Sequence, residues 1–255
     1  MKQAKEDIAK SLDVNNLDLL EYIPYLLKDL FDMGSNPNSV LEVIKKYNIL
    51  KSTDAKVLDL GCGKGAVSIR IANELGVKVY GIDLMEAFIE EAKNYATKFG
   101  VSELCKFDVA DIKDIVKTEL ECDLVIFGAI GQVFGSYEKT LAALYLPIKN
   151  GGYLIIDDGY IDDDSNYSNE NYMKHEHLLK IINESGFILV EEKIEGNVQA
   201  TNKRYFELIK KRAEELKKIY PDKSLMFEDY VNSQQKENFT LENKVKCAVF
   251  VLKKK

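Results

Sequence analysis

The sequence is poor in the residues that build disulfide frameworks and metal sites. It contains four cysteines in 255 residues, with no Cys-x-x-Cys pair, and two histidines, His175 and His177. Because Cys105, Cys122 and Cys247 fall in strand-like runs, we expect them to be reduced core residues. The two histidines are two positions apart and do not share a face of a helix, so the sequence predicts no metal site.

The sequence also lacks long apolar segments. No apolar run approaches the roughly 20 residues of a membrane-spanning helix. The first ten residues, MKQAKEDIAK, are charged and have no apolar centre of the kind found in secretory signals. With 46% hydrophobic and 30% charged residues, the chain has the composition of a protein with a buried core. We therefore expect a cytoplasmic protein with no membrane partner.

An excess of positive charge is absent as well. The formal net charge is -7, which disfavours nucleic acid as a partner. The distribution is uneven, because residues 201–255 hold 14 Lys and Arg against 8 Asp and Glu. Since few aromatic residues are interleaved with these charges, we interpret the segment as a solvated helical face and not as an RNA-binding surface.

Hydrophobic periodicity indicates the fold class from residue 55 onward. Strand-like apolar runs occupy 55–60, 77–84, 104–109, 121–130, 150–158, 187–195 and 244–252. Helical patterns separate most of them, at 65–76, 85–100, 137–148 and 175–186. Strands and helices that alternate through short connections form a parallel sheet with helices on both faces. The sequence thus predicts an α/β fold.

Two segments lie outside this alternation. The first fifty residues look helical, and the apolar spacing over 19–35 predicts an amphipathic helix, followed by a second helix capped by Ser39. A long charged helix over 201–220 interrupts the rhythm before the last strand. We therefore expect an N-terminal helical extension at 1–50, and a domain at 51–255 that carries a helical insertion at about 197–243.

Polar residues and glycines stand at the carboxyl ends of the expected strands. They are Asp59 with Gly61, Gly63 and Gly65 after the first strand, Asp83 after the second, Asp108 after the third and Gly128 after the fourth. Ligands of open parallel sheets bind outside the carboxyl ends of the strands. Glycines allow the backbone to approach such a ligand closely, and a carboxylate at the end of the second strand can accept both hydroxyls of a ribose. These features predict a nucleotide cofactor.

The glycines alone leave the cofactor open, because GCGKGA also satisfies the dinucleotide fingerprint. Asp59 lies two residues before the first glycine, where an acid opposes a pyrophosphate but suits a ligand that carries an ammonium group. Lys64 lacks the spacing of a P-loop lysine. An NAD-dependent oxidoreductase therefore stays as an alternative, disfavoured by Asp59.

Five segments, in order, resemble the motifs of class I S-adenosylmethionine-dependent methyltransferases. They are VLDLGCGKG at 57–65, GID at 81–83, KFDVAD at 106–111, CDLVIFGAI at 122–130 and IKNGGYLIIDD at 148–158. The resemblance covers roughly residues 55–195. It implies a Rossmann-like, seven-stranded, mostly parallel sheet whose last strand, VKCAVFVL, is antiparallel and lies beside the fifth.

The resemblance also implies where S-adenosylmethionine is held. Gly61, Gly63 and Gly65 pass beneath its methionine part, with Asp59 near the amino group. Asp83 holds the ribose hydroxyls.

On the adenine side, the resemblance places Leu84 and Met85 against the ring, while Asp108 and Val109 read its edge. Phe127 and Gly128 border the reacting methyl group.

The resemblance implies methyl transfer, and we expect an in-line transfer to a small-molecule acceptor, with S-adenosylhomocysteine as product. Candidates for a general base, if the acceptor must lose a proton, are Asp157, His175 and His177. Strand four ends in FGAI and lacks the Asn-Pro-Pro arrangement of enzymes that methylate nucleic-acid bases. A protein that binds S-adenosylmethionine or S-adenosylhomocysteine without catalysis is the second alternative.

Overall fold

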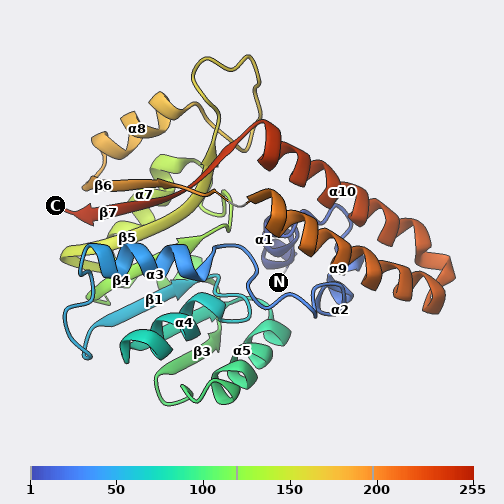
Figure 1. Ribbon diagram of the computed structural model, residues 1–255, viewed down its shortest axis with the longest axis horizontal. Coiled ribbons are helices and arrows are strands. Elements are labelled where there is room, and N and C mark those ends of the chain that lie inside the picture. The colour runs from blue at the N-terminus through green and yellow to red at the C-terminus, as the bar shows by residue number, and fades with distance from the viewer. Residues whose placement is uncertain (1, 119, 197) are drawn as a thin grey trace.

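The computed structural model describes residues 2–118, 120–196 and 198–255, and within them the chain forms one seven-stranded sheet (Figure 1). The strands are β1 (Lys56–Leu60), β2 (Lys78–Asp83), β3 (Cys105–Val109), β4 (Cys122–Gly128), β5 (Ile148–Tyr160), β6 (Phe187–Ile194) and β7 (Lys246–Lys254). Their order is β3-β2-β1-β4-β5-β7-β6, and β7 runs antiparallel to both neighbours. The predicted α/β fold, with its last strand antiparallel beside the fifth, is confirmed.

Helices cover both faces of this sheet and one of its ends. They are α1 (Lys2–Ser11), α2 (Ile23–Leu26), α3 (Pro37–Lys46), α4 (Ala66–Leu75), α5 (Glu86–Lys98), α6 (Ile112–Ile115), α7 (Tyr137–Tyr145), α8 (His175–Glu184), α9 (Val198–Ile219) and α10 (Ser224–Asn243), with short 3-10 helices at Leu17–Glu21 and Pro221–Lys223. Figure 1 shows α9 and α10 side by side, projecting from the sheet. Among the described residues, no helix is long and apolar enough to cross a membrane.

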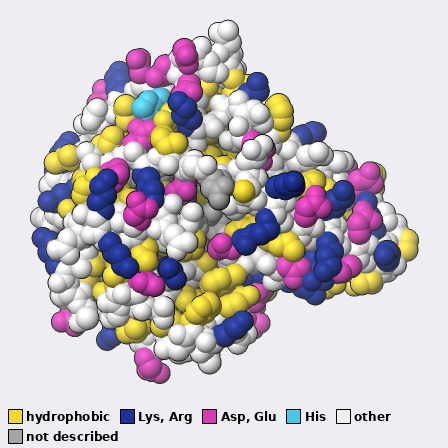
Figure 2. Space-filling view, viewed as in Figure 1, with side chains coloured by type: hydrophobic (Ala, Val, Ile, Leu, Met, Phe, Trp, Pro, Cys, Tyr) yellow, Lys and Arg dark blue, Asp and Glu magenta, His cyan; other side chains and the backbone are white. Residues whose placement is uncertain are grey.

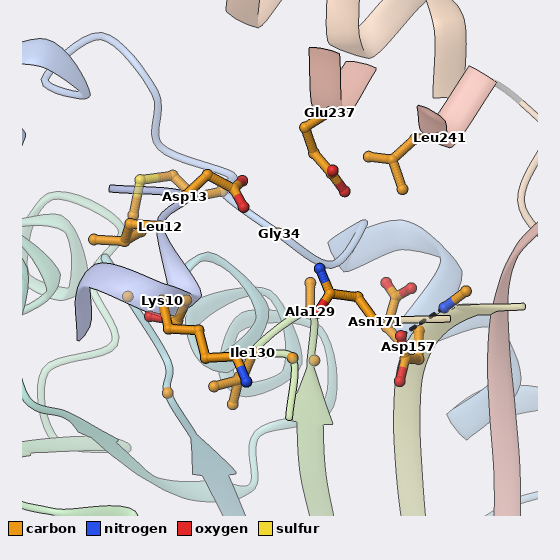
Figure 3. A pocket seen from close by; sticks show the side chains of 18 of the residues that line it. Lys10, Leu12, Asp13, Gly34, Ala129, Ile130, Asp157, Asn171, Glu237 and Leu241 are labelled. Carbon is orange, nitrogen blue, oxygen red and sulfur yellow. Dashed lines mark hydrogen bonds between the residues drawn. The ribbon is translucent and has the colours of Figure 1, made fainter. Parts of the chain in front are cut away.

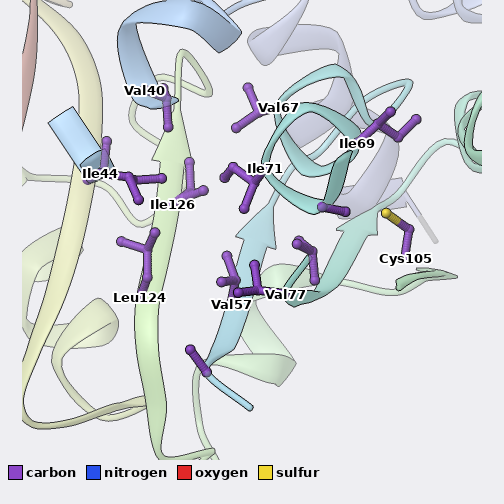
Figure 4. Packing of buried hydrophobic residues seen from close by; sticks show 14 of the residues in the cluster. Val40, Ile44, Val57, Val67, Ile69, Ile71, Val77, Cys105, Leu124 and Ile126 are labelled. Carbon is purple, nitrogen blue, oxygen red and sulfur yellow. The ribbon is translucent and has the colours of Figure 1, made fainter. Parts of the chain in front are cut away.

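Side chains of alternate strand residues belong to two separate hydrophobic cores, one on each face of the sheet. Val57 and Ile126 pack with Val67 and Ile71 of α4 on one face (Figure 4). On the other face, neighbouring strand residues such as Val125 pack against α7 and α8. Strands buried on both faces must be apolar at nearly every position, which explains the near-continuous apolar run of β4.

A third core joins the two ends of the chain. Leu19 and Ile23 from the N-terminal segment pack with Ala213 of α9 and with Phe227 of α10, and all four side chains are at most 2% exposed. Tyr22 meets the Phe227 ring edge-on, with 5.2 Å between ring centroids. The N-terminal helices and the α9–α10 pair therefore hold each other in place over one end of the sheet.

The exposed side of α9 carries both signs of charge. Figure 2 shows basic and acidic side chains interspersed over the projecting helices. Arg212 pairs with Asp29 at 2.5 Å and with Glu215 at 2.7 Å, and Lys217 pairs with Glu214 at 3.0 Å. The excess of lysine and arginine in this part of the sequence is thus partly matched by acidic neighbours on the same surface.

The continuous helix predicted over 19–35 is wrong. The chain forms instead a 3-10 helix at Leu17–Glu21 and the four-residue helix α2. Pro24 has no N–H with which to continue the preceding turn, and the Leu27 carbonyl accepts a hydrogen bond from Lys64 Nζ at 2.8 Å. The same carbonyl also accepts from the Leu30 N–H at 3.0 Å, so the chain here makes a tight local turn and a long-range contact in place of a continuous helix.

The predicted cap of the next helix is also wrong. Helix α3 begins at Pro37, and the Asn36 side chain accepts the hydrogen bond of the Asn38 N–H at 3.0 Å. Ser39 lies inside the helix and is buried. Asparagine before a proline at the first helical position is an equally good start signal, so the error is one of three positions.

Candidate cofactor and acceptor site

The turn between β1 and α4 is built from glycines that no other residue replaces without strain. Gly61, Gly63 and Gly65 have φ values of 66°, 52° and 78°, in the region that side chains with a Cβ disfavour. A Cβ at Gly61 would lie 2.5 Å from Ile130 Cδ1, and one at Gly65 would lie 2.7 Å from the Phe107 ring. The turn therefore brings bare backbone to the carboxyl edge of the sheet.

Asp83, the last residue of β2, holds this turn from the side. Its two carboxylate oxygens accept hydrogen bonds from the Gly63 N–H and the Met85 N–H, both at 2.9 Å. Burial raises the pKa of Asp83, and these backbone donors oppose the rise. A carboxylate has about four acceptor positions, so Asp83 keeps two for a ligand.

Asp59 lies beneath the turn. It is 4% exposed, and its Oδ2 accepts a hydrogen bond from the Ser68 hydroxyl of α4 at 2.6 Å. Burial raises its pKa to about 7, and the nearby charge of Asp83 adds to this rise. The two aspartates thus place acidic groups below and beside the glycine turn.

Lys64, inside the turn, faces away from the cavity. Its side chain is fully buried, and its Nζ pairs with Glu91 at 2.8 Å in addition to its bond with the Leu27 carbonyl. The lysine is thus committed to protein groups and is not directed at a ligand phosphate. A turn flanked by carboxylates suits hydroxyl and ammonium groups better than a pyrophosphate.

A cavity of about 960 Å³ opens beside this turn (Figure 3). Gly61, Gly63, Asp83 and Gly128 line it from the sheet edge. Helices α1, α9 and α10 contribute the opposite walls, and Figure 3 shows Glu237 and Leu241 of α10 above the loop that carries Ala129 and Ile130. Its charged side chains are Asp7, Lys10, Asp13, Asp83, Lys113, Asp157, Asp158, Glu195 and Glu237.

Strand register explains why the predicted residues meet at one edge. In the sheet Ile82 is the partner of Asp108, and Gly128 is the partner of Asp157. Four of the eleven predicted cofactor residues line the cavity: Gly61, Gly63, Asp83 and Gly128. Phe127 is 4% exposed and packs against Phe134, with ring centroids 5.8 Å apart, so it lies behind the wall.

The residues predicted for the adenine side lie at the outer end of β2 and β3. Lys106 pairs with Asp108 at 2.7 Å and lowers the pKa of that carboxyl, and the Tyr80 hydroxyl donates to it at 2.9 Å. Val109 is 49% exposed. Leu84 follows β2, and the next residue, Met85, packs against the third core. None of these four lines the cavity among the described residues.

The three general-base candidates fall in different surroundings. Asp157 lines the cavity, and burial raises its pKa to about 7. His175 lies away from it, with Nε2 2.8 Å from Glu192 and the ring stacked on Tyr160 at 4.2 Å. His177 is exposed on α8. The structure therefore brings only Asp157 of the three to the cavity.

Several cavity residues escaped the sequence analysis. Asp13, Glu195 and Glu237 come from the N-terminal segment, the end of β6 and α10. Cys247, expected in the core, also lines the cavity, while all four cysteines are free thiols. No local pattern marks such residues, because they meet only when separate segments pack together, the N-terminal segment with Asp13 and α10 with Glu237 among them.

The fold and the glycine turn define a nucleotide-cofactor protein of the Rossmann-like type, and comparison with known proteins narrows this class. A family model described as a methyltransferase domain matches residues 51–220. Over 105 residues the chain is 30% identical to the uncharacterized protein YjhP of Escherichia coli, which covers 41% of this chain and 42% of YjhP. The chain thus spans less than half of that curated relative by sequence.

Solved structures show the same fold over a longer stretch. The crystal structure of YjhP superposes with a TM-score of 0.73 at 20% identity, covering 91% of this chain and all of that one. A Geobacter sulfurreducens protein, a SAM-dependent methyltransferase solved with S-adenosyl-L-homocysteine, gives 0.75 at 19% identity, covering 92% and 98%. The chain belongs to the methyltransferase-domain family, the class I S-adenosylmethionine-dependent methyltransferases.

Proposed function

We propose that the protein is an enzyme that transfers a methyl group from S-adenosylmethionine, the cofactor of its family, to a small-molecule acceptor in the same cavity. The observation that carries this proposal is the continuous cavity of about 960 Å³ between the glycine turn and α10. Small-molecule sites usually measure about 300–1,000 Å³, so this one suits a cofactor and a small acceptor side by side.

The residues at the sheet edge fit this cofactor. Gly61 and Gly63 present backbone where a Cβ would intrude, and Asp83 has free acceptor positions for ribose hydroxyls. Asp59, beneath the turn, favours the ammonium end of the ligand through its charge. Gly65 is the last residue of the turn and immediately precedes α4.

The outer residues complete the proposed site. Leu84 and Met85 are proposed to contact the adenine, and Asp108 and Val109 to bind its edge. Phe127 and Gly128 are proposed to lie beside the reacting methyl group.

When bound, S-adenosylmethionine supplies a methyl group on a sulfonium, whose carbon bonds to the acceptor atom while the electron pair of the broken C–S bond stays on sulfur. The protein mainly has to align the acceptor in line with that bond and exclude water. Helices α9 and α10 form a wall suited to exclusion. Asp157 is placed to take a proton from the acceptor, because its raised pKa lies near neutral pH.

We also propose that the chain consists of an N-terminal helical extension at 1–50 and a methyltransferase domain at 51–255 with a helical insertion at about 197–243. Residues 1–50 and about 197–243 pack on each other over the sheet edge, which supports their assignment as an acceptor-covering layer on the methyltransferase domain at 51–255.

Calorimetry and thermal shift with S-adenosylhomocysteine, with NADH as control, test the cofactor. A ligand at about 100 times its dissociation constant adds roughly 2.7 kcal/mol to stability. Transfer of labelled methyl groups into a metabolite extract then tests catalysis. Failure to bind S-adenosylhomocysteine contradicts the proposal, whereas binding without transfer favours the alternative of a cofactor-binding protein without catalysis.

A further inference from the structure

Four carboxyl groups from three different elements line the cavity. They are Asp157 and Asp158 at the end of β5, Glu195 after β6 and Glu237 of α10, and we refer to them as the carboxylate cluster. Cys247 lines the same cavity, and burial together with the charges of these four carboxyls raises the pKa of its thiol to about 12. In Figure 3, Glu237 points down and Asp157 lies below it on the facing side.

No positive side chain balances the carboxylate cluster. Within the described part of the chain, none of its members forms an ion pair with lysine, arginine or histidine within 4.0 Å. Glu237 accepts a hydrogen bond from the Tyr172 hydroxyl at 2.7 Å, and Asp158 one from the Gly159 N–H at 2.7 Å. These neutral donors leave the negative charge uncompensated, and buried charges without partners are costly.

The two lysines of the cavity lie on other elements. Lys113, in α6, pairs with Asp7 at 2.6 Å. Lys10 extends from α1 and lies on the opposite side of the view from Asp157 (Figure 3). Both cavity lysines therefore come from the wall opposite the carboxylate cluster.

Unpartnered polar atoms surround the carboxylate cluster. Among the described residues, Glu195 Oε1 is buried without a hydrogen-bond partner. The Tyr137 hydroxyl, on a residue 8% exposed, is unpartnered too and lies near Asp158, whose charge adds to the effect of burial in raising the tyrosine pKa. Ser35 Oγ, on a residue 4% exposed, is also buried without a partner among the described residues. Of these three residues only Glu195 lines the cavity, and its unpaired carboxylate oxygen is a buried polar atom open to a polar ligand there.

A bound metal ion is a poor match for this geometry. Across the residues that the structure describes, no group of three or more histidine, cysteine, aspartate or glutamate side chains converges closely enough to hold a metal ion. An organic ammonium group presents up to three N–H donors in different directions, which suits carboxyls that do not converge on one point.

We propose that the acceptor is an amine, bound as its ammonium against the carboxylate cluster, and that its nitrogen is the methylated atom. The inference rests on the proposed methyl transfer and adds the chemical class of the acceptor. An ammonium nitrogen has no free electron pair, so one proton must leave it first. That proton passes to a carboxylate oxygen of Asp157, which gives a neutral amine and a neutral carboxylic acid. The methylated nitrogen then carries the positive charge again, within reach of Asp158 and Glu237.

The first test identifies the methylated atom. The protein is incubated with methyl-labelled S-adenosylmethionine and a metabolite extract, and the labelled products are characterised by mass spectrometry and NMR. We expect the label on a nitrogen atom. Label on oxygen, sulfur or carbon overturns the amine acceptor but leaves methyl transfer standing, whereas no transfer at all contradicts both proposals.

The second test reads binding and needs no turnover. Methylammonium chloride, sodium chloride and sodium acetate are compared at equal ionic strength and pH 8, with S-adenosylhomocysteine present, by thermal shift. We expect methylammonium to raise the midpoint by about 2–4 °C relative to sodium chloride, and acetate to have no such effect. Such small ions test charge without depending on the shape of the cavity.

Variants assign this effect to the carboxylate cluster. Combined Glu195→Gln and Glu237→Gln should weaken methylammonium binding about tenfold, and they remove buried charge, so the unliganded midpoint should not fall. Glu184→Gln on the exposed end of α8, paired with Lys180, is the matched control and should behave as wild type. Equal responses to methylammonium and acetate, or an unaltered response in the double variant, overturn the proposal.

Discussion

The Lys64 ammonium donates a 2.8 Å hydrogen bond to the carbonyl of Leu27, thirty-seven residues earlier in the chain. Lys64 belongs to the glycine turn, whereas Leu27 follows α2 in the N-terminal segment. The same ammonium pairs with Glu91 of α5 at 2.8 Å and lies 5.8 Å from the centroid of the Phe88 ring. One buried cation thus fixes the segment that covers the cavity to the turn proposed to hold the cofactor.

Replacing this cation should destabilise the fold. Lys64→Met leaves the Leu27 carbonyl and Glu91 without their partner, and we expect the free energy of unfolding to fall by about 1–3 kcal/mol. Urea unfolding of the full chain measures this loss in the free energy of unfolding. Lys45→Met, which breaks the exposed pair with Glu74, is the control and should cost less than about 1 kcal/mol. Equal losses in the two variants contradict the structural role of Lys64.

Asp83 should dominate cofactor affinity. Asp83→Ala removes the carboxylate proposed for the ribose and releases the Gly63 N–H. We expect binding of S-adenosylhomocysteine to weaken by about 1.5–3 kcal/mol, measured by calorimetry. Asp114→Ala on the exposed side of α6 is the control and should leave affinity unchanged. Undiminished affinity in a folded Asp83→Ala protein removes the ribose assignment.

Glycine substitutions separate backbone strain from close approach. Gly65 and Gly76 both have left-handed backbone, with φ of 78° and 65°, but a Cβ at Gly76 meets nothing within 4 Å. Gly76→Ala should therefore cost about 1 kcal/mol from the backbone conformation alone. Gly65→Ala also drives a Cβ to within 2.7 Å of the Phe107 ring and should cost clearly more. Chemical denaturation of both variants checks the order, and an equal cost disproves tight packing under the turn.

Asp59 should make stability depend on pH. Its pKa is about 7 in the folded protein, against about 4 in an unfolded chain, because burial penalises the charged form. Between these values the folded state binds a proton that the unfolded state releases. The contribution of Asp59 to stability is therefore complete below pH 4 and is lost as the pH rises through 7. Asp59→Asn should gain stability relative to wild type on going from pH 4 to pH 8.

Asp108 supplies a control of opposite sign. Lys106 lowers its pKa, so its contribution is present above pH 4 and is lost as the pH falls through the lowered value. Asp108→Asn should therefore be less stable than wild type at higher pH, and this difference in stability should shrink in acid. Thermal unfolding of the three proteins from pH 3 to pH 8 measures both trends. If the difference in stability between wild type and Asp59→Asn does not change with pH, the raised pKa of the buried Asp59 carboxyl is contradicted.

The sequence by itself determined the sheet and the edge at which a cofactor belongs. Apolar runs of strand length alternate with helical patterns from residue 55, and short connections allow few topologies, so the order of elements fixed the architecture. Asp59, Asp83 and Asp108 lie at the carboxyl ends of consecutive strands, which places them at one sheet edge without knowledge of distant contacts. These signals are local. They predict the folded structure correctly where both faces of a strand are buried.

Only the tertiary structure decided what covers that edge and with which charge. The continuous helix expected over 19–35 does not form, and the Leu27 carbonyl there accepts from Lys64, a partner that no local pattern contains. Asp157, Glu195 and Glu237 meet because α10 and β7 pack where apolar surface is best buried. Apolar burial is nondirectional, so it brings distant polar groups together without any sign in the sequence. The arrangement of the carboxylate cluster in the cavity is therefore a property of the folded chain.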